Sequence, residues 1–146
     1  MRLDITRRAD LATRALVVLA GSGARVKGAR LAQVLDTTPG FVPQVLQPLL
    51  QAGWVRSEPG PTGGYVAAVA LDDVSVLDVI EAVEGVTPTA RCVLVDRPCN
   101  ESGRCALHEP WARARTQLLG ELARTPLSAL PPVGAVDAID TAETPR

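Results

Sequence analysis

Three segments with helical spacing of apolar residues follow one another within the first 51 residues, and a glycine- and proline-rich turn comes soon after them. The first covers residues 9–21, with Gly21 placed to end it, and the second covers residues 29–35. The third covers residues 39–51 and follows the turn sequence DTTPG, in which Thr38 is the expected N-cap. Aromatic residues make up only 3% of the chain, so the core must consist mostly of Ala, Leu and Val, which suits helices.

Two strand-like runs, residues 54–57 and 65–70, flank the sequence PGPTGG and predict a hairpin. Three helices, the last two closely spaced, followed by a hairpin have the order of a winged helix-turn-helix. The predicted fold is therefore mainly α with a small β-hairpin wing, and residues 1–72 form the predicted DNA-binding domain. Small helical domains with a hairpin also serve other purposes, so the pattern alone does not identify a function.

Two prolines fall within the third predicted helix. Pro43 lies in the first turn, where the missing N–H is harmless. Pro48 lies in the interior, where it should kink the helix or end it early. We therefore expect this helix to depart from regular geometry.

The sequence VSVLDVIEAVEG predicts a fourth helix, with Ser75 and Asp78 in a capping box and Gly85 as its stop. The segment after it, residues 87–103, has very few apolar side chains beyond Val93, Leu94 and Val95. Such a segment cannot bury enough surface to order itself.

A long helix then begins at Pro110 and ends near Arg124. Its apolar residues form one stripe, which can pack against a partner molecule or against the chain's own domain. They are Trp111, Ala114, Leu118, Leu119 and Leu122. Residues 73–130 thus form a second predicted unit, a sensor loop followed by a long C-terminal helix. Residues 131–146 are low in large apolar residues and are predicted to be a disordered tail.

Charge is distributed unevenly along the chain, although the net charge is only −1. Residues 1–56 carry eight Lys and Arg against three acidic residues, a net charge of +5, which leaves −6 for the remainder. A basic N-terminal part suits contact with phosphate, and a randomly solvated surface is the other interpretation of the same count.

The sequence TRRADLATRALVVLAGSGA places two arginines before an apolar run, as in an export signal. Arg14 interrupts the run and leaves only residues 15–20 unbroken, which is shorter than the roughly 7–15 residues of such a signal. No segment approaches the length needed to span a membrane. We therefore expect a cytoplasmic protein, with no membrane contact, whose cysteines stay reduced.

All three cysteines and the only histidine form one cluster, Cys92, Cys99, Cys105 and His108, with the spacing C-x6-C-x5-C-x2-H. Soft sulfur ligands select zinc, copper(I) or an iron-sulfur cluster. Structural zinc sites usually contain a tighter pair of cysteines, so this wide spacing on a loop favours a larger inorganic core. Redox-active thiols and a zinc site stay open as alternatives. No base is evident for a nucleophilic cysteine, and no enzyme activity is predicted.

These segments resemble the family of bacterial iron-sulfur regulators that includes IscR, NsrR and RirA. The resemblance covers residues 1–130 and is carried by RRADLATRALVVLA, LAQVLDTTPGFVPQVLQPLLQAGWV, GPTGGY, VSVLDVIEAVEG and the three-cysteine loop. It implies a homodimer whose long C-terminal helices cross, with each subunit placing its helix-turn-helix on half of a promoter site. It also implies an iron-sulfur cluster near the dimer interface that reports iron-sulfur status, nitric oxide or redox state.

The resemblance offers two candidates for a fourth ligand. Members similar to IscR use a histidine just after the third cysteine, and His108 matches that position. Members similar to NsrR use a carboxylate from the first helix of the other subunit, and Asp10 matches that one. His108 favours [2Fe-2S], which we expect ahead of the [4Fe-4S] cluster that Asp10 would favour. Asp10 could equally be a charge that interacts with the dipole of its helix.

Expected DNA contacts fall into two sets outside the wing. The first set suits backbone phosphates and comprises Arg2, Arg7, Arg8, Lys27 and Arg30. In the second, Gln44 matches a base-contacting position of the family and can pair with adenine, and its expected neighbours are Thr38 and Gln47.

In the wing, the family often carries an arginine just before the glycines, where this chain has Pro59. Arg56 is the expected substitute for contact with a narrow minor groove, alongside Thr62, Gly63 and Tyr65.

Together these observations predict a dimeric, DNA-binding transcription regulator that senses redox state, nitric oxide or iron-sulfur status through a cysteine-ligated cluster. One alternative is a regulator without a cluster that responds through thiol oxidation, for example between Cys92 and Cys99. A second alternative, from another class, is a zinc-binding or small electron-transfer protein.

Overall fold

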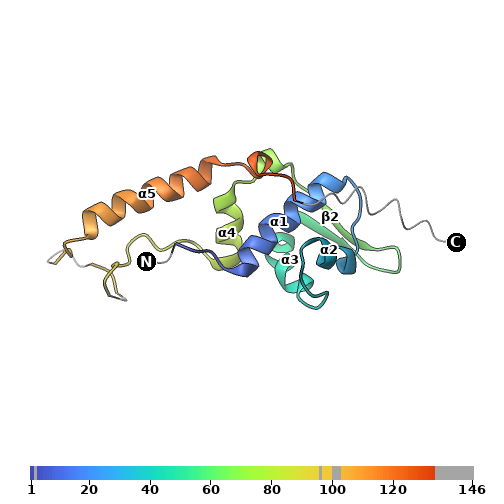
Figure 1. The fold of residues 1–146 in the computed structure, drawn as a ribbon, viewed down its shortest axis with the longest axis horizontal. Helices are drawn as coiled ribbons and strands as arrows, with labels where there is room; N and C mark the ends of the chain where they lie inside the picture. Colours follow the sequence, from blue (N-terminus) through green and yellow to red (C-terminus); the bar gives the residue numbers. More distant parts are fainter. Residues whose placement is uncertain (2, 96, 100–102, 134–146) are drawn as a thin grey trace.

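The computed structural model describes residues 1, 3–95, 97–99 and 103–133. Its elements confirm the predicted fold class: three helices, a hairpin and two further helices (Figure 1). The helices are α1 (Arg7–Ser22), α2 (Gly28–Val34), α3 (Val42–Gln51), α4 (Val76–Glu84) and α5 (His108–Arg124). The strands are β1 (Val55–Glu58) and β2 (Gly64–Ala67), and the short 3-10 helices are η1 (Leu71–Asp73) and η2 (Leu127–Ala129).

Helix α1 lies at the centre of the core. Thr6 caps it, since the Thr6 hydroxyl accepts a hydrogen bond from the N–H of Ala9 at 3.1 Å. The helix packs against α3, α4 and β2. Its buried leucines meet leucines and valines of α2 and α3, namely Leu11, Leu16, Leu19, Leu31, Leu35, Val45, Leu46 and Leu49. The core is thus aliphatic, as the scarcity of aromatic residues requires.

Strands β1 and β2 form an antiparallel hairpin in which Val55 lies opposite Ala67. Two backbone hydrogen bonds of 2.9 Å between Val26 and Tyr65 tie this hairpin to the segment before α2. A Cβ on Gly63 would lie 2.0 Å from the carbonyl oxygen of Glu58, closer than any real contact. The tip of the hairpin therefore closes only with glycine at this position.

Helix α4 begins with the predicted capping box. The Ser75 hydroxyl accepts from the N–H of Asp78 at 3.1 Å, and the Asp78 carboxylate accepts from the N–H of Ser75 at 2.8 Å. The helix ends at Gly85, whose φ of +90° favours glycine. Both predictions for this helix are confirmed.

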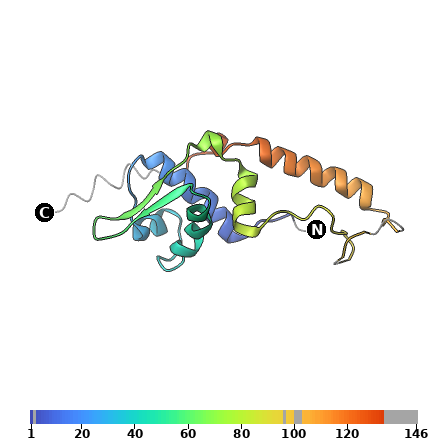
Figure 2. The same cartoon turned by 180° about the vertical axis from the view of Figure 1, so that it is seen from behind.

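Helix α5 projects from the core, and its C-terminal end is anchored there (Figure 1, Figure 2). The N–H of Val76 donates to the carbonyl of Thr125, and the N–H of Leu127 donates to the carbonyl of Val74, both at 2.9 Å. The side chain of Leu127 is fully buried among core residues. The N-terminal end of α5 lies far from the hairpin, beside the cysteine loop.

Two predicted helix boundaries are wrong for local reasons. Helix α1 continues through Gly21 to Ser22, because the glycine that takes the left-handed conformation is Gly23, with φ of +61°. Helix α5 begins at His108 instead of Pro110, because proline is tolerated within the first turn of a helix.

The start of α3 also differs from the prediction. Thr38 is not its N-cap: the N–H of Phe41 donates to the carbonyl of Thr38 at 3.0 Å, which closes a turn before the helix begins at Val42. Pro43 lies in the first turn, as predicted.

Pro48 lies inside α3, and the helix runs on to Gln51, its predicted end, so of the two predicted effects of this proline the early end does not occur. The proline ring is buried against the core, where packing of the apolar face outweighs one missing backbone hydrogen bond.

The predicted tail lies mostly outside the described residues, which end at Val133. Val133 itself packs against the core and is partly buried. In the part of the chain that the structure describes, no helix has both the length and the apolar character to cross a membrane.

Candidate functional site

The cysteine loop brings three sulfur atoms together near the start of α5. The Sγ atom of Cys105 lies 3.8 Å from that of Cys92 and 3.9 Å from that of Cys99. All three Sγ atoms lie within 4.8 Å of one another, and each side chain is half-buried. Within the described residues, this is the one group of three or more Cys, His, Asp or Glu arranged to share a metal.

Backbone N–H groups favour the thiolate form of Cys92. The N–H of Leu94 donates to Cys92 Sγ at 3.4 Å, and this bond, with another from Val95, lowers the pKa of the Cys92 thiol to about 7. Burial has the opposite effect on Cys105 and raises the pKa of its thiol. Metals bind thiolates, so Cys92 offers the readier donor of these two cysteines.

His108 lies near Cys92 and Cys105 but is not part of the 4.8 Å group that the three sulfur atoms form. It begins α5, its N–H donates to the carbonyl of Cys105 at 3.0 Å, and it lines a small hollow together with Cys92 and Trp111. The hollow therefore connects the cysteines to the predicted histidine ligand.

Arg115 holds the loop against α5, a role that the sequence did not indicate. Its guanidinium donates to the carbonyl of Thr89 at 2.7 Å and to those of Pro88 and Arg91 at 3.4 Å each. These carbonyls belong to three of the four residues that precede Cys92. An arginine within the run ARAR has no sequence signal that separates it from a solvated neighbour, because the contact joins segments 24 to 27 residues apart.

The donor set fits a soft metal or an iron-sulfur group. Two thiolates bound to one tetrahedral metal, at metal–sulfur distances of about 2.3 Å, lie about 3.8 Å apart. The Cys105 sulfur has this spacing to both Cys92 and Cys99. The spacing of the Cys105 sulfur to the other two is therefore that of ligands on a single metal ion.

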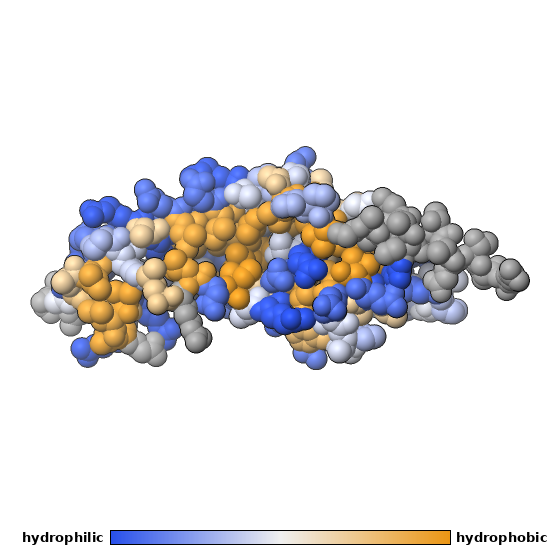
Figure 3. Space-filling model, viewed as in Figure 1, coloured by the Kyte–Doolittle hydropathy of each residue, from blue (hydrophilic) through white to orange (hydrophobic). Residues whose placement is uncertain are grey.

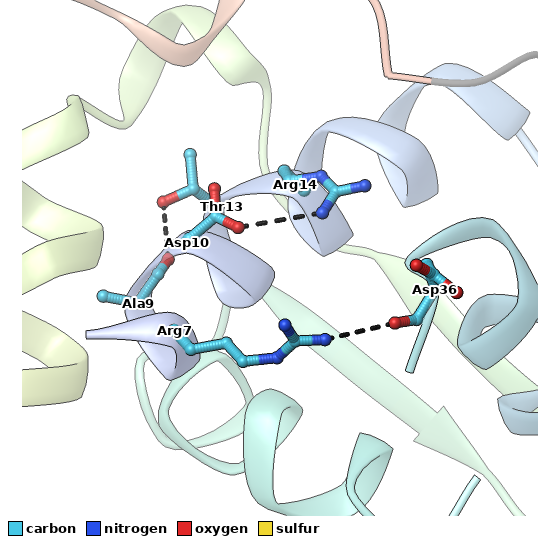
Figure 4. A network of polar contacts seen from close by, with 6 residues as sticks. All are labelled: Arg7, Ala9, Asp10, Thr13, Arg14 and Asp36. Atoms are coloured by element: carbon cyan, nitrogen blue, oxygen red, sulfur yellow. Dashed lines mark hydrogen bonds and ion pairs between the residues drawn. The ribbon is translucent and has the colours of Figure 1, made fainter. Parts of the chain in front are cut away.

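Asp10, the other predicted fourth ligand, lies on the exposed side of the first turns of α1. Its carboxylate is 3.7 Å from the guanidinium of Arg14 (Figure 4). Ligation by Asp10 needs a second subunit, and within the described residues of one chain it is not grouped with the cysteines.

Helix α3 is placed as the recognition helix of a helix-turn-helix. Its apolar face is buried, and the side chains of Gln44 and Gln47 are exposed on the opposite face. Thr38 is exposed in the turn before it. The predicted base-contacting residues thus share one accessible surface.

The wing residues differ in accessibility. Arg56 and Thr62 are exposed, and Tyr65 is half-buried against the chain before α2. Gly63 is buried, and the backbone of Glu58 leaves no room for a side chain there. The need for glycine at position 63 is therefore steric, whatever contact the wing makes with DNA.

The predicted phosphate contacts are also placed differently from one another. Lys27 is exposed at the start of α2, while the Arg30 side chain bonds to Gln33 of its own helix. The guanidinium of Arg8 is turned toward α3, where its Nε donates to the carbonyl of Gln44 at 2.9 Å. Arg2 lies outside the described residues.

A model of the Rrf2 family, described as iron-dependent transcriptional regulators, matches residues 5–131. The chain belongs to the Rrf2 family.

Two regulators with known sequences are similar to this Rrf2 chain. An HTH-type transcriptional regulator of Mycobacterium tuberculosis is 32% identical over 129 residues, which span 86% of this chain and 80% of that protein. An HTH-type transcriptional regulator of Aquifex aeolicus is 28% identical over 95 residues, which span 64% of this chain and 66% of that protein.

Solved Rrf2-type structures share the fold. CymR, the global cysteine regulator of B. subtilis, has a TM-score of 0.71 and 27% identity, and the match covers 88% of this chain and 95% of that one. IscR of T. potens has a TM-score of 0.69 and 18% identity, with 99% and 93% covered. The Rrf2 chain is thus a DNA-binding transcriptional regulator and not an enzyme.

Proposed function

We propose that this Rrf2-family regulator senses redox state, nitric oxide or iron-sulfur status through an iron-sulfur cluster held by Cys92, Cys99 and Cys105. The observation that supports the proposal is the convergence of three Sγ atoms within 4.8 Å on one loop. When bound, such a cluster supplies iron and sulfide that react with oxidants and nitric oxide. The loop supplies thiolates, and Arg115 holds its backbone in place.

As fourth ligand we propose His108, with [2Fe-2S] ahead of [4Fe-4S]. His108 lines the same hollow as Cys92 and Cys105, whereas Asp10 would have to come from another subunit.

A second copy of the chain is the proposed partner of α5. In the described structure no residue of α5 is buried, and Leu118 is 44% exposed on its predicted apolar stripe. Figure 3 shows apolar surface along α5 and over the cysteine loop, which a homodimer would cover. In the dimer each recognition helix would take one half of a promoter site.

The cysteine loop connects the end of α4 to the start of α5, so it is placed to set the direction of α5. Ligation would fix the loop, whose apolar content is too low to order it alone. The direction of α5 would in turn set the spacing of two recognition helices in the dimer.

Anaerobic purification of the full chain tests the cluster proposal. We expect the wild type to contain iron and sulfide and to absorb visible light. Cys105→Ala should lose the iron, the sulfide and the absorption, and His108→Ala should keep them with an altered spectrum. Asp10→Ala is the matched variant for the competing ligand and should leave the spectrum unchanged. Protein that carries neither iron nor sulfide, or that contains zinc in their place, would contradict the proposal.

Thiol oxidation is the second candidate, because two sulfur pairs already lie 3.8 and 3.9 Å apart. A peroxide would take two electrons and two protons from two thiols, which forms one disulfide and water. Iron-free protein that loses DNA affinity on peroxide treatment, and regains it with a reducing thiol, would favour it.

A further inference from the structure

Pro48 leaves one backbone carbonyl of the recognition helix without its usual partner. In an α-helix each N–H bonds to the carbonyl four residues earlier, and proline has no N–H. The carbonyl four residues before Pro48 belongs to Gln44. Gln44 lies at the surface, where its carbonyl can accept a hydrogen bond from water or from a side chain.

Arg8 supplies a side-chain donor from α1. Its Nε donates to the Gln44 carbonyl oxygen at 2.9 Å, and the two residues are 36 positions apart in the sequence. The backbone around Arg8 is fixed, since Ala9 and Leu11 are at most 1% exposed in the core. A hydrogen bond from a guanidinium is charge-assisted and stronger than a neutral one. It therefore ties α3 firmly to the central helix.

Arg7 makes a parallel contact with the turn of the helix-turn-helix. Its Nη2 donates to the carbonyl of Asp36 at 3.2 Å (Figure 4). Asp36 lies between α2 and α3 with φ of +53°, a conformation that favours glycine. The first turn of α1 thus bonds to both the turn and the recognition helix.

We propose that Arg8 is a positioning residue for sequence recognition: it provides the donor that Pro48 lacks and so fixes the orientation of α3 on the DNA. The carbonyl that Arg8 binds belongs to Gln44, whose exposed side chain is the proposed adenine contact. Loss of the bond would change the angle of this side chain and reduce discrimination between sequences. This inference goes beyond the cluster and does not depend on it.

The test separates the donor of Arg8 from its charge. Arg8→Gln removes the charge but keeps an N–H donor at the depth of Nε along the side chain. Arg8→Met removes the charge and the donor, at similar length. The probes are the duplex that the wild type enriches most from a random-sequence pool and a shuffled duplex of the same composition. The measured quantity is the ratio of the two affinities over a range of salt concentrations.

We expect Arg8→Met to lower this ratio roughly tenfold, as for a lost hydrogen bond to a charged group, and Arg8→Gln to lower it much less. Both variants should bind the shuffled duplex equally. Pro48→Ala returns an N–H to the Gln44 carbonyl, so Arg8→Met should cost little when added to Pro48→Ala. Arg30→Gln, the charge control, should lower the affinities for both duplexes by the same factor.

A phosphate contact by Arg8 would give a different result. Arg8→Met and Arg8→Gln would then lose the same factor on both duplexes, each with a salt slope smaller by about one. An equal cost of Arg8→Met with and without Pro48→Ala would also overturn the proposal.

Discussion

A side chain of any size at position 63 would collide with the backbone of the wing. The expected Cβ position lies 2.0 Å from the Glu58 carbonyl oxygen. The sequence marked Gly63 as part of a DNA-binding wing, but the steric requirement could not be predicted, because it depends on how the hairpin closes.

We predict that Gly63→Ala destabilises the fold by about 1–3 kcal/mol, the usual cost of a strained backbone. Urea denaturation measures this change. Gly40→Ala is the control, since no atom lies within 4 Å of its added Cβ and its φ is not positive. Equal stability of the two variants would contradict the steric interpretation.

Leu127 shows how a residue far along the chain completes the core. It is 0% exposed, and it follows a helix that projects away from that core. We predict that Leu127→Ala lowers the free energy of unfolding by about 2–5 kcal/mol. Leu3→Ala, at a side chain that is 67% exposed, should change it by less than about 0.5 kcal/mol. The measurement is again denaturation by urea.

At the scale of elements, the order of helices and strands followed from periodicity and turn residues alone. The capping box of Ser75 and Asp78 was predictable because both partners are close in sequence. The way in which α3 accommodates Pro48 was not, because the carbonyl that the proline leaves free, that of Gln44, is bound by Arg8, 36 positions away in the sequence. Local signals thus predicted the element types, and a distant contact explains how α3 accommodates its proline.

The hydrogen bonds from Arg115 to the backbone of the cysteine loop predict how fast amides in that loop exchange. In metal-free protein, Arg115→Met should speed amide hydrogen exchange in residues 89–92, because three carbonyl contacts are lost. Arg113→Met, two residues away on the exposed side of α5, is the matched control. Hydrogen exchange with mass spectrometry measures both. Equal exchange in the two variants would mean that the loop is held by other contacts.

At the scale of the whole molecule, the sequence separated a basic N-terminal part from a cysteine-bearing part. In the structure, α2 and α3 lie on the far side of α4 from the cysteine loop, whereas the N-terminus runs toward that loop (Figure 2). The convergence of three sulfur atoms was predictable from residue type. Their mutual distances were not, because they depend on how α5 and the loop meet.

The proposed homodimer predicts that Leu118→Glu gives a monomer, since a charge on the apolar stripe of α5 would be buried in the dimer. Sedimentation equilibrium should show half the mass of the wild type. Gln117→Glu places the same charge at an adjacent exposed position and should leave the mass unchanged. A wild type that sediments as a monomer would rule out this use of α5.

The anchorage of α5 at Thr125 and Leu127 makes that junction a pivot, with the cysteines at the free end of a lever. Seventeen helical residues span about 25 Å, so a swing of about 10° at the pivot moves the free end by about 4 Å. A large displacement at the cysteine end of α5 thus corresponds to a small rotation at the junction. In the proposed mechanism, a change of a few ångströms at the cysteines would therefore turn α5 relative to the DNA-binding domain by about 10°.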